Sequence, residues 1–285
     1  MASAIAAMRT PLCASIAALL VAACVGSTGG DVIDFPAAAA GPDRAAAAGA
    51  PLEFTNDRGW HVVLTKAKLH VGALYLSQSQ PVSGAQVTSC VLPGTYVAQI
   101  TTGLDVDLLS PVPQRFPALG HGTTLDALVG QVWLSGGAED HDLDQLSDTT
   151  PILVIEGTAD QAGTVRPFTG QITIAENRQP ESSAVAGSNT ICKQRIVSPI
   201  PTHVTIEHAG GLLLRVDPRQ LFVNVDFGQL VKSSSPSGFA FSDDPSQIDP
   251  ASPLYYSQPS VNLYQNLHAA GTFNPLYSFV WDSTL

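Results

Sequence analysis

Lysine and arginine are scarce in this sequence. Only 13% of its 285 residues are charged, and 13 Lys and Arg stand against 24 Asp and Glu, which gives a formal net charge of −11. Binding to a phosphate backbone needs concentrated positive charge, so this composition excludes nucleic acid as a partner. Hydrophobic residues make up 45% of the chain, which excludes a disordered protein because enough apolar surface is present to form a core.

Sequence motifs of known catalytic chemistry are also absent. The chain contains no Gly-x-Ser-x-Gly, His-Glu-x-x-His or Ser-x-x-Lys motif, no phosphate-binding glycine loop and no Gly-x-Gly-x-x-Gly. We therefore expect a protein that is not an enzyme. Catalytic triads and carboxylate pairs are defined in space and not along the sequence, so an extracytoplasmic hydrolase is kept as a third interpretation.

Long apolar runs are missing, apart from one near the N-terminus. Residues 1–23 contain no acid and one cation, Arg9, followed by an apolar run from Leu12 to Ala23. This run is too short to span a bilayer comfortably as a helix. Its length and flanks are those of a secretory signal peptide.

The residues at the end of the run indicate the kind of signal. Val21-Ala22-Ala23-Cys24 resembles the lipobox of bacterial lipoproteins. This resemblance implies a signal peptide over residues 1–23, lipidation of the Cys24 thiol and an acyl anchor in a lipid bilayer of the cell envelope. Val25 stands where lipoproteins of the inner membrane carry Asp, so we expect the outer membrane. The alternative is an ordinary signal peptide in which Cys24 has no special role.

The segment after Cys24 is rich in Ala, Gly and Pro. Breakers such as Pro36 and Gly41 interrupt its alanine runs before a stable helix length is reached. We expect the lipidated cysteine and a flexible stalk over residues 24–50, and a single β-sandwich domain over residues 51–285.

Cysteine is rare, with four in the chain. Cys13 would leave with the signal peptide and Cys24 would carry lipid, so Cys90 and Cys192 remain. Two cysteines in an oxidising compartment predict one disulfide, Cys90–Cys192. The alternative is a metal site that uses both thiolates, but no Cys-x-x-Cys spacing supports it.

Short strands separated by turns dominate the chain from residue 51 onward. Within residues 60–76 the alternation of apolar residues slips by one position near Thr65, which is typical of a bulge or of a break between two strands. The pattern predicts a mostly β fold, an antiparallel β-sandwich of immunoglobulin- or transthyretin-like type. The strand candidates are residues 52–54, 60–76, 95–100, 104–109, 131–134, 151–156, 168–174, 204–206 and 212–216.

One or two short helices are predicted near the C-terminus. The segment 217–222 begins with a capping Asp followed by Pro, which suits one helical turn. The segment 260–271 begins with Ser and ends on Gly, as a short helix does. The aromatic residues of 277–281 alternate and predict a final strand with one face toward the core.

Two pairs of segments resemble known groups of proteins. Both pairs resemble a group of uncharacterised bacterial lipoproteins, and this resemblance implies no activity. They are Gly59-Trp60 with His70–Leu76, and Val216–Arg219 with Leu221–Phe227. The strand over residues 64–76 and the aromatic C-terminus are also similar to the copper-binding MbnP-like β-sandwich proteins. The metal ligands of those proteins have no residue-by-residue match in this chain.

The densest polar cluster lies at residues 139–148. Asp140, Asp142 and Asp144 fill the first three ligand positions of an EF-hand calcium loop, but the glycine and the bidentate glutamate of that loop are missing. The alternative is a solvated acidic loop. The candidate ligands of a divalent metal ion are Asp140, His141, Asp142, Asp144 and His70.

Two classes of function follow from these observations. The first is a membrane-anchored, non-catalytic lipoprotein whose loops contact a small ligand or another envelope protein. The second is a metal-binding lipoprotein of the periplasm or cell surface, for copper, zinc or calcium.

Overall fold

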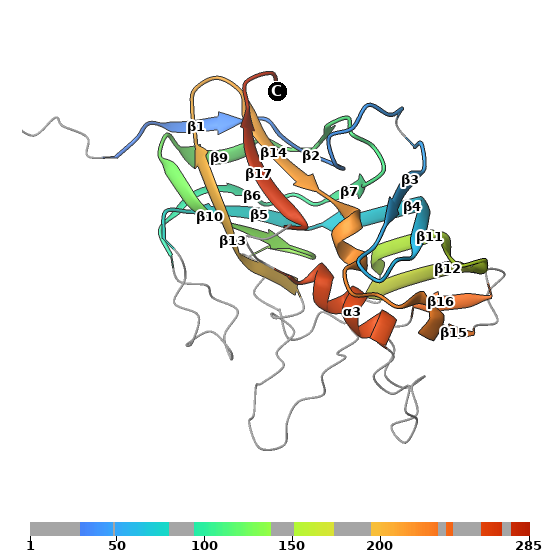
Figure 1. Cartoon of the computed structure of the whole chain (residues 1–285). Coiled ribbons are helices and arrows are strands. Elements are labelled where there is room, and N and C mark those ends of the chain that lie inside the picture. Colours follow the sequence, from blue (N-terminus) through green and yellow to red (C-terminus); the bar gives the residue numbers. More distant parts are fainter. Residues whose placement is uncertain are drawn as a thin grey trace, which may run out of the picture.

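A computed structural model describes residues 29–47, 49–79, 94–137, 151–173, 195–232, 238–241, 258–269 and 275–285. Within these ranges the chain is mostly β, and its strands form three sheets (Figure 1). Most strand pairs are antiparallel, while β2 and β14 run parallel, as do β12 and β16. No helix among the described residues is long and apolar enough to cross a membrane. The predicted mostly β, sandwich-like fold with short helices is confirmed.

Each sheet brings together strands from distant parts of the chain. Sheet A has the order β1 (Val32–Phe35), β9 (Gly120–Thr123), β6 (Tyr96–Ile100), β5 (Ala73–Ser77), β10 (Asp126–Trp133) and β13 (Ile196–Thr205). Sheet B has the order β17 (Tyr277–Asp282), β14 (Gly211–Val216), β2 (Ala37–Ala40) and β8 (Gln114–Arg115). Sheet C has the order β15 (Val231–Lys232), β16 (Phe239–Phe241), β12 (Thr164–Thr173), β11 (Pro151–Gln161), β4 (His61–Val71) and β3 (Leu52–Thr55), and β7 (Leu104–Asp107) also pairs with β4.

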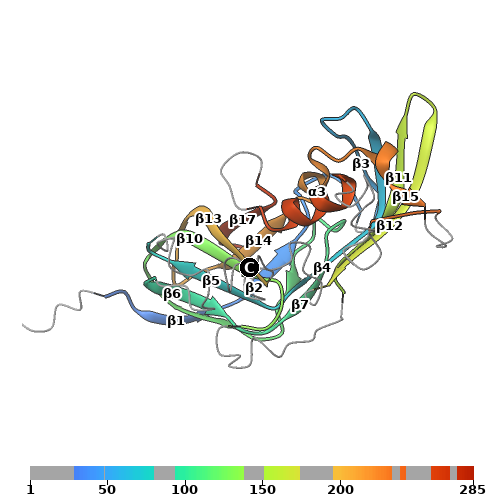
Figure 2. The ribbon, with the colours of Figure 1, turned by 90° about the horizontal axis from the view of Figure 1, so that it is seen from below.

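One long segment, β4 followed by β5, connects sheet C to sheet A. The pairing of β4 with β11 shifts by one residue at Thr65, because Lys66 lies opposite Glu156 while Leu64 lies opposite Gly157. The slip predicted near Thr65 is therefore a β-bulge. Gly72 separates the two strands, and Figures 1 and 2 show sheets A and C on opposite sides of the molecule with this segment running between them.

The described part of the predicted flexible stalk over residues 24–50 contains two strands, which corrects that prediction. Strand β1 pairs with β9, and β2 lies between β14 and β8 in sheet B. The four alanines of β2 are each at most 2% exposed. A strand covered on both faces needs small side chains where its neighbours approach closely, so the alanine run is a core strand and not a linker. The folded domain therefore begins near residue 31 and not at residue 51.

Sheets A and B pack face to face in one hydrophobic core. Phe279 of β17 lies over Gly130 of β10, where a Cβ atom would come within 2.1 Å of the ring. Phe35 of β1 meets Trp281 of β17 with ring centroids 5.1 Å apart. Tyr277 and Phe279 are both buried, as the predicted final strand with a core-facing side requires.

Short helical elements cover one side of sheet C. They are η2 (Pro218–Phe222), η3 (Phe227–Gln229) and α3 (Gln258–Leu267). The first and the last lie close to the predicted helical segments 217–222 and 260–271, whereas η3 was not predicted. Asp217 caps η2 by accepting the backbone N–H of Arg219. Phe222 and Phe227 stack on each other and surround Phe168 of β12, at centroid distances of 5.1–5.9 Å. This aromatic cluster fixes the helical segment on the sheet.

Several predicted features lie outside the described residues. They are the signal peptide over residues 1–23, the lipidated Cys24, the Cys90–Cys192 disulfide and the acidic segment 139–148.

Candidate functional site

The histidines of the described chain are spread over the molecule. Four of them each lie beside one carboxylate, and no group of three His, Cys, Asp or Glu side chains in the described ranges could hold a metal ion. The histidines therefore do not form a metal site among themselves in this part of the chain. The four pairs are His61–Glu53 at 4.0 Å, His70–Asp105 at 2.6 Å, His121–Asp34 at 2.8 Å and His208–Asp31 at 3.2 Å.

His70 differs from the other three histidines in its surroundings. Its residue lies directly opposite Asp105 in the antiparallel pair of β4 and β7, so the two side chains share one face of the sheet. The His70 side chain is 36% exposed, whereas those of His121 and His208 are 60% and 67% exposed. The contact uses Nδ1 of His70, which leaves Nε2 for another partner.

Glycines make room for a cavity of about 510 Å³ beside His70, which we call the His70 cavity. A Cβ atom on Gly103 would lie 3.2 Å from Cε1 and 3.3 Å from Nε2 of His70, so this glycine leaves the free edge of the imidazole uncovered. A Cβ atom on Gly72 would lie 2.5 Å from the backbone nitrogen of Gly136. The cavity is lined by His70, Gly72, Tyr75, Thr101, Gly103, Gly136 and Gly137.

One aromatic residue, Tyr75, lines the cavity, and two others pack against it. Tyr75 is 3% exposed and packs against Trp133 and Tyr96, with ring centroids 5.5 and 5.6 Å apart. Burial raises the pKa of Tyr96, an effect opposed by its hydrogen bond with Gln131. The Tyr96 phenol therefore stays protonated at neutral pH.

The acidic segment predicted from the sequence adjoins this cavity along the chain. Gly137 lines the cavity, and the segment 139–148 begins two residues after it in the sequence. The predicted ligands Asp140, His141, Asp142 and Asp144 lie outside the described residues, so of the predicted metal ligands only His70 has a described position.

Most of the residues that shape the cavity are not evident from the sequence. Asp105 is one acid among many, and Gly103 is not distinguished from the other glycines of the chain. Gly72 inside a long alternating strand was the available signal, because glycine within a strand marks a bend or a close approach of another backbone.

The arrangement suits ligand binding at the free nitrogen of His70. A carboxylate on Nδ1 fixes the orientation of the ring, as is usual for histidines that bind metal ions. The same pair is also two thirds of a catalytic triad, but among the described cavity residues the only hydroxyl nucleophiles are Thr101 and the phenol of Tyr75.

Comparison with known proteins adds one structural likeness. No protein-family model and no curated protein sequence matches the chain. Among solved structures, MbnP from Methylosinus trichosporium is similar at 13% sequence identity and a TM-score of 0.41, over 87% of this chain and 98% of that one. Neither value is high enough to assign a shared ligand or activity to the two proteins.

Proposed function

We propose that the protein is a lipid-anchored protein of the bacterial outer membrane that binds a ligand without catalysis, and that the His70 cavity is its binding site. The observation that carries this proposal is the His70–Asp105 pair beside a cavity that glycines keep open. A concave site with a few fixed polar groups and an aromatic residue in its lining is typical of small-ligand binding.

The anchor is tested by a Cys24→Ala variant of the full chain. Without the thiol no diacylglycerol can be attached, so the variant should leave the membrane fraction and appear in the soluble fraction of the cell envelope. A variant that still sediments with membranes would refute the anchor.

We infer a divalent metal ion as the ligand from the chemistry of His70. Its Nε2 is a borderline-soft nitrogen ligand of the kind that copper and zinc accept. The other ligands predicted from the sequence, Asp140, His141, Asp142 and Asp144, lie outside the described residues. The alternative occupant is a small organic molecule that uses His70 as a hydrogen-bond partner.

Calorimetric titration with Cu²⁺ and with Zn²⁺ tests this assignment. The matched control is His121→Ala, because His121 has the same contact with a carboxylate, at 2.8 Å, but lies outside the cavity. We expect His70→Ala to weaken binding of the tighter metal at least tenfold and His121→Ala to leave it unchanged. Equal affinity of the wild type and His70→Ala would refute a metal site at His70.

A further inference from the structure

A second cavity lies on the outer face of sheet B. Strands β14 and β17 pair so that Leu213 lies opposite Val280 and Arg215 opposite Ser278. Side chains alternate along a strand, so Leu212 and Leu214 enter the core while Leu213 and Arg215 face outward. This outward face therefore carries an apolar surface and a cation side by side.

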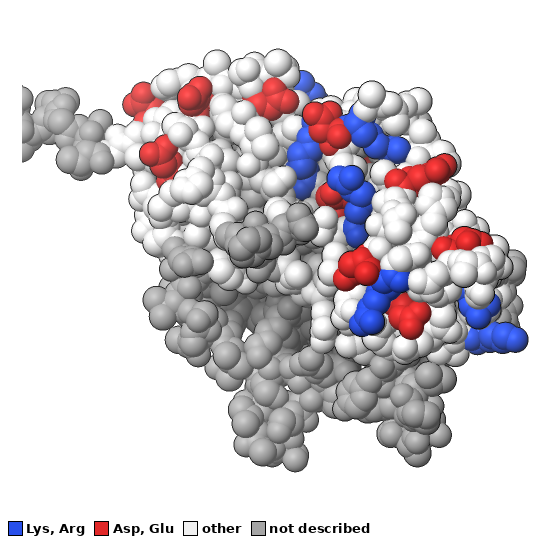
Figure 3. All heavy atoms as spheres, in the orientation of Figure 1, with Lys and Arg blue, Asp and Glu red and all other residues white. Residues whose placement is uncertain are grey.

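This cavity has a volume of about 500 Å³, and we call it the arginine groove. Among its apolar lining residues Val280 is exposed, whereas Leu213 and Leu276 are each only 3% exposed, and its charged lining residues are Asp43, Arg215, Asp217, Arg219 and Asp282. A volume of this size is within the range of small-ligand sites, roughly 300–1,000 Å³. In Figure 3 blue and red side chains lie intermixed on the half of the molecule that carries β3 and β11 in Figure 1.

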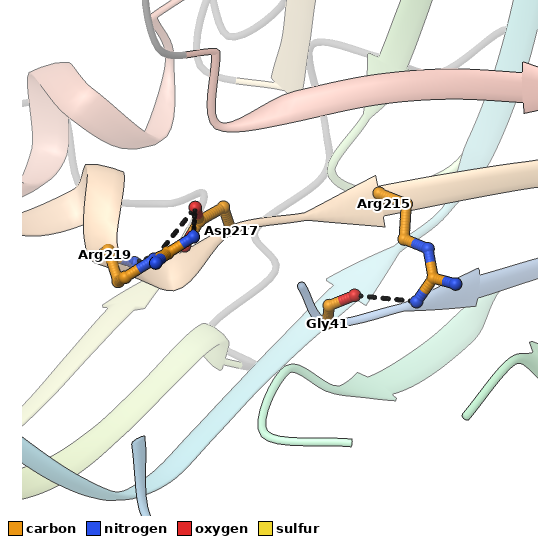
Figure 4. Close-up of polar contacts among 4 residues, drawn as sticks. All are labelled: Gly41, Arg215, Asp217 and Arg219. Atoms are coloured by element: carbon orange, nitrogen blue, oxygen red, sulfur yellow. Dashed lines mark hydrogen bonds and ion pairs between the residues drawn. The ribbon is translucent and has the colours of Figure 1, made fainter. Parts of the chain in front are cut away.

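Arg215 is held in place by the backbone (Figure 4). Its Nη1 donates to the carbonyl oxygen of Gly41 at 3.1 Å and to that of Pro111 at 2.8 Å. Nε and Nη2 make no hydrogen bond to any residue in the described ranges. A fixed guanidinium with free donors is prepared to bind an anion with little loss of conformational entropy.

Arg219 stands nearby and is paired with Asp217 (Figure 4). Its Nε and Nη2 donate to both carboxylate oxygens, at 2.6–3.0 Å. This pair is neutral as a whole and leaves Nη1 of Arg219 without a partner among the described residues.

The groove also contains negative charge. Asp43 is exposed at its rim and makes no hydrogen bond within the described chain, and Asp282 accepts hydrogen bonds from Thr284. A ligand with only negative charge would be repelled by Asp43 and Asp282. A ligand with only positive charge would be repelled by Arg215 and Arg219. A ligand that carries one charge of each sign matches both.

We propose that the arginine groove binds short peptides through their charged ends. The peptide carboxylate accepts hydrogen bonds from Arg215 and Arg219, the ammonium faces Asp43, and an apolar side chain contacts Val280. This site is separate from the His70 cavity, and its existence does not depend on metal binding there.

Titration calorimetry with four forms of the dipeptide Leu-Leu tests the proposal. The forms are the free dipeptide, the N-acetylated one, the C-terminal amide and the doubly capped one. We expect only the free dipeptide to bind fully, with each single cap weakening binding roughly tenfold, because each removes one charge-assisted contact. Equal binding of all four forms, or no binding of the free dipeptide at 10 mM, a concentration chosen to be about tenfold above a weak millimolar Kd, would overturn it.

Variants locate the site. Asp43→Asn changes an exposed carboxylate and should leave the fold intact while weakening the free dipeptide roughly tenfold and the N-acetylated form not at all. Glu207→Gln, another exposed acid outside the groove, is the control and should change neither. Arg215→Gln should abolish binding of the carboxylate-bearing forms, and its fold is checked by circular dichroism. Unchanged binding in Asp43→Asn would exclude the proposed orientation.

Discussion

At the residue scale, the surroundings of a side chain decide whether it can bind a ligand more than its residue type does. His70 and His121 each contact one aspartate at similar distances, yet His70 borders a cavity of about 510 Å³ that His121 does not line. The difference comes from glycines whose missing side chains leave space beside the imidazole. A histidine–carboxylate pair is thus a candidate site only where the backbone around it leaves room for a ligand.

Asn56 is the residue whose loss should cost the most stability for its size. It is 9% exposed, and its Nδ2 donates to the carbonyl oxygens of Phe222 and Val225 at 3.2 and 2.8 Å. Its Oδ1 accepts the backbone N–H groups of Arg58 and Trp60. Asn56→Ala leaves these groups without partners and should lower the free energy of unfolding by about 2–4 kcal/mol.

Chemical denaturation measures this cost. Asn262→Ala is the matched control, because its amide donates to only one carbonyl oxygen, that of Asn224, at a more exposed position. It should lower the free energy of unfolding by about 1 kcal/mol or less. A smaller effect at Asn56 than at Asn262 would contradict the role given to Asn56.

Tyr277 should make the protein sensitive to alkaline pH. Burial raises the pKa of its phenol above the ordinary tyrosine value, and its hydroxyl donates to the carbonyl oxygen of Leu267 at 3.0 Å. Because the folded pKa is the higher one, the unfolded chain loses this proton first. Stability is therefore complete below about pH 10 and falls as the pH rises above it.

Urea unfolding of wild type and Tyr277→Phe at neutral pH and above about pH 10 checks this dependence. The variant should be about 1 kcal/mol less stable at neutral pH and should lose less stability on going to alkaline pH. Equal slopes for the two proteins would show that another group dominates.

At the scale of elements, the sequence predicted most strands and both short helical segments. Alternation identified β4 and β17, and even the slip at Thr65, because each of these strands has one face toward the core. It failed for β2, where both faces are buried and every side chain is alanine, so that no alternation remains. The His70 cavity escaped prediction for a related reason, since it depends on pairing between strands and not on local pattern.

The N-terminal strands should therefore be essential for folding. A chain that begins at residue 51 lacks β1 and β2, so β14 keeps β17 on one side but loses its neighbour β2 on the other, in the centre of sheet B. We expect it to be insoluble or to lack a cooperative thermal transition, whereas a chain that begins at residue 29 should unfold like the full mature protein. A cooperative, equally stable product from residue 51 onward would contradict the place given to β2.

At the scale of the whole molecule, the position of β1 makes the proposed tether shorter than the stalk predicted over residues 24–50. Only residues 25–31 separate Cys24 from Val32. A chain of that length reaches at most about 25 Å. An anchored domain would therefore be held close to the bilayer by its β1 edge, and the tether would restrict how the domain can turn. The His70 cavity and the arginine groove both lie in this domain.

The binding site is tested most directly by the nuclear magnetic resonance spectrum of the chain from residue 29 with Cu²⁺ added. A paramagnetic ion broadens the amide signals of residues near it. If the His70 cavity is the site, the signals of Gly72, Gly103 and Gly136 should broaden first. Broadening that begins at His121 and His208, or uniform broadening with no preferred residues, would contradict the assignment.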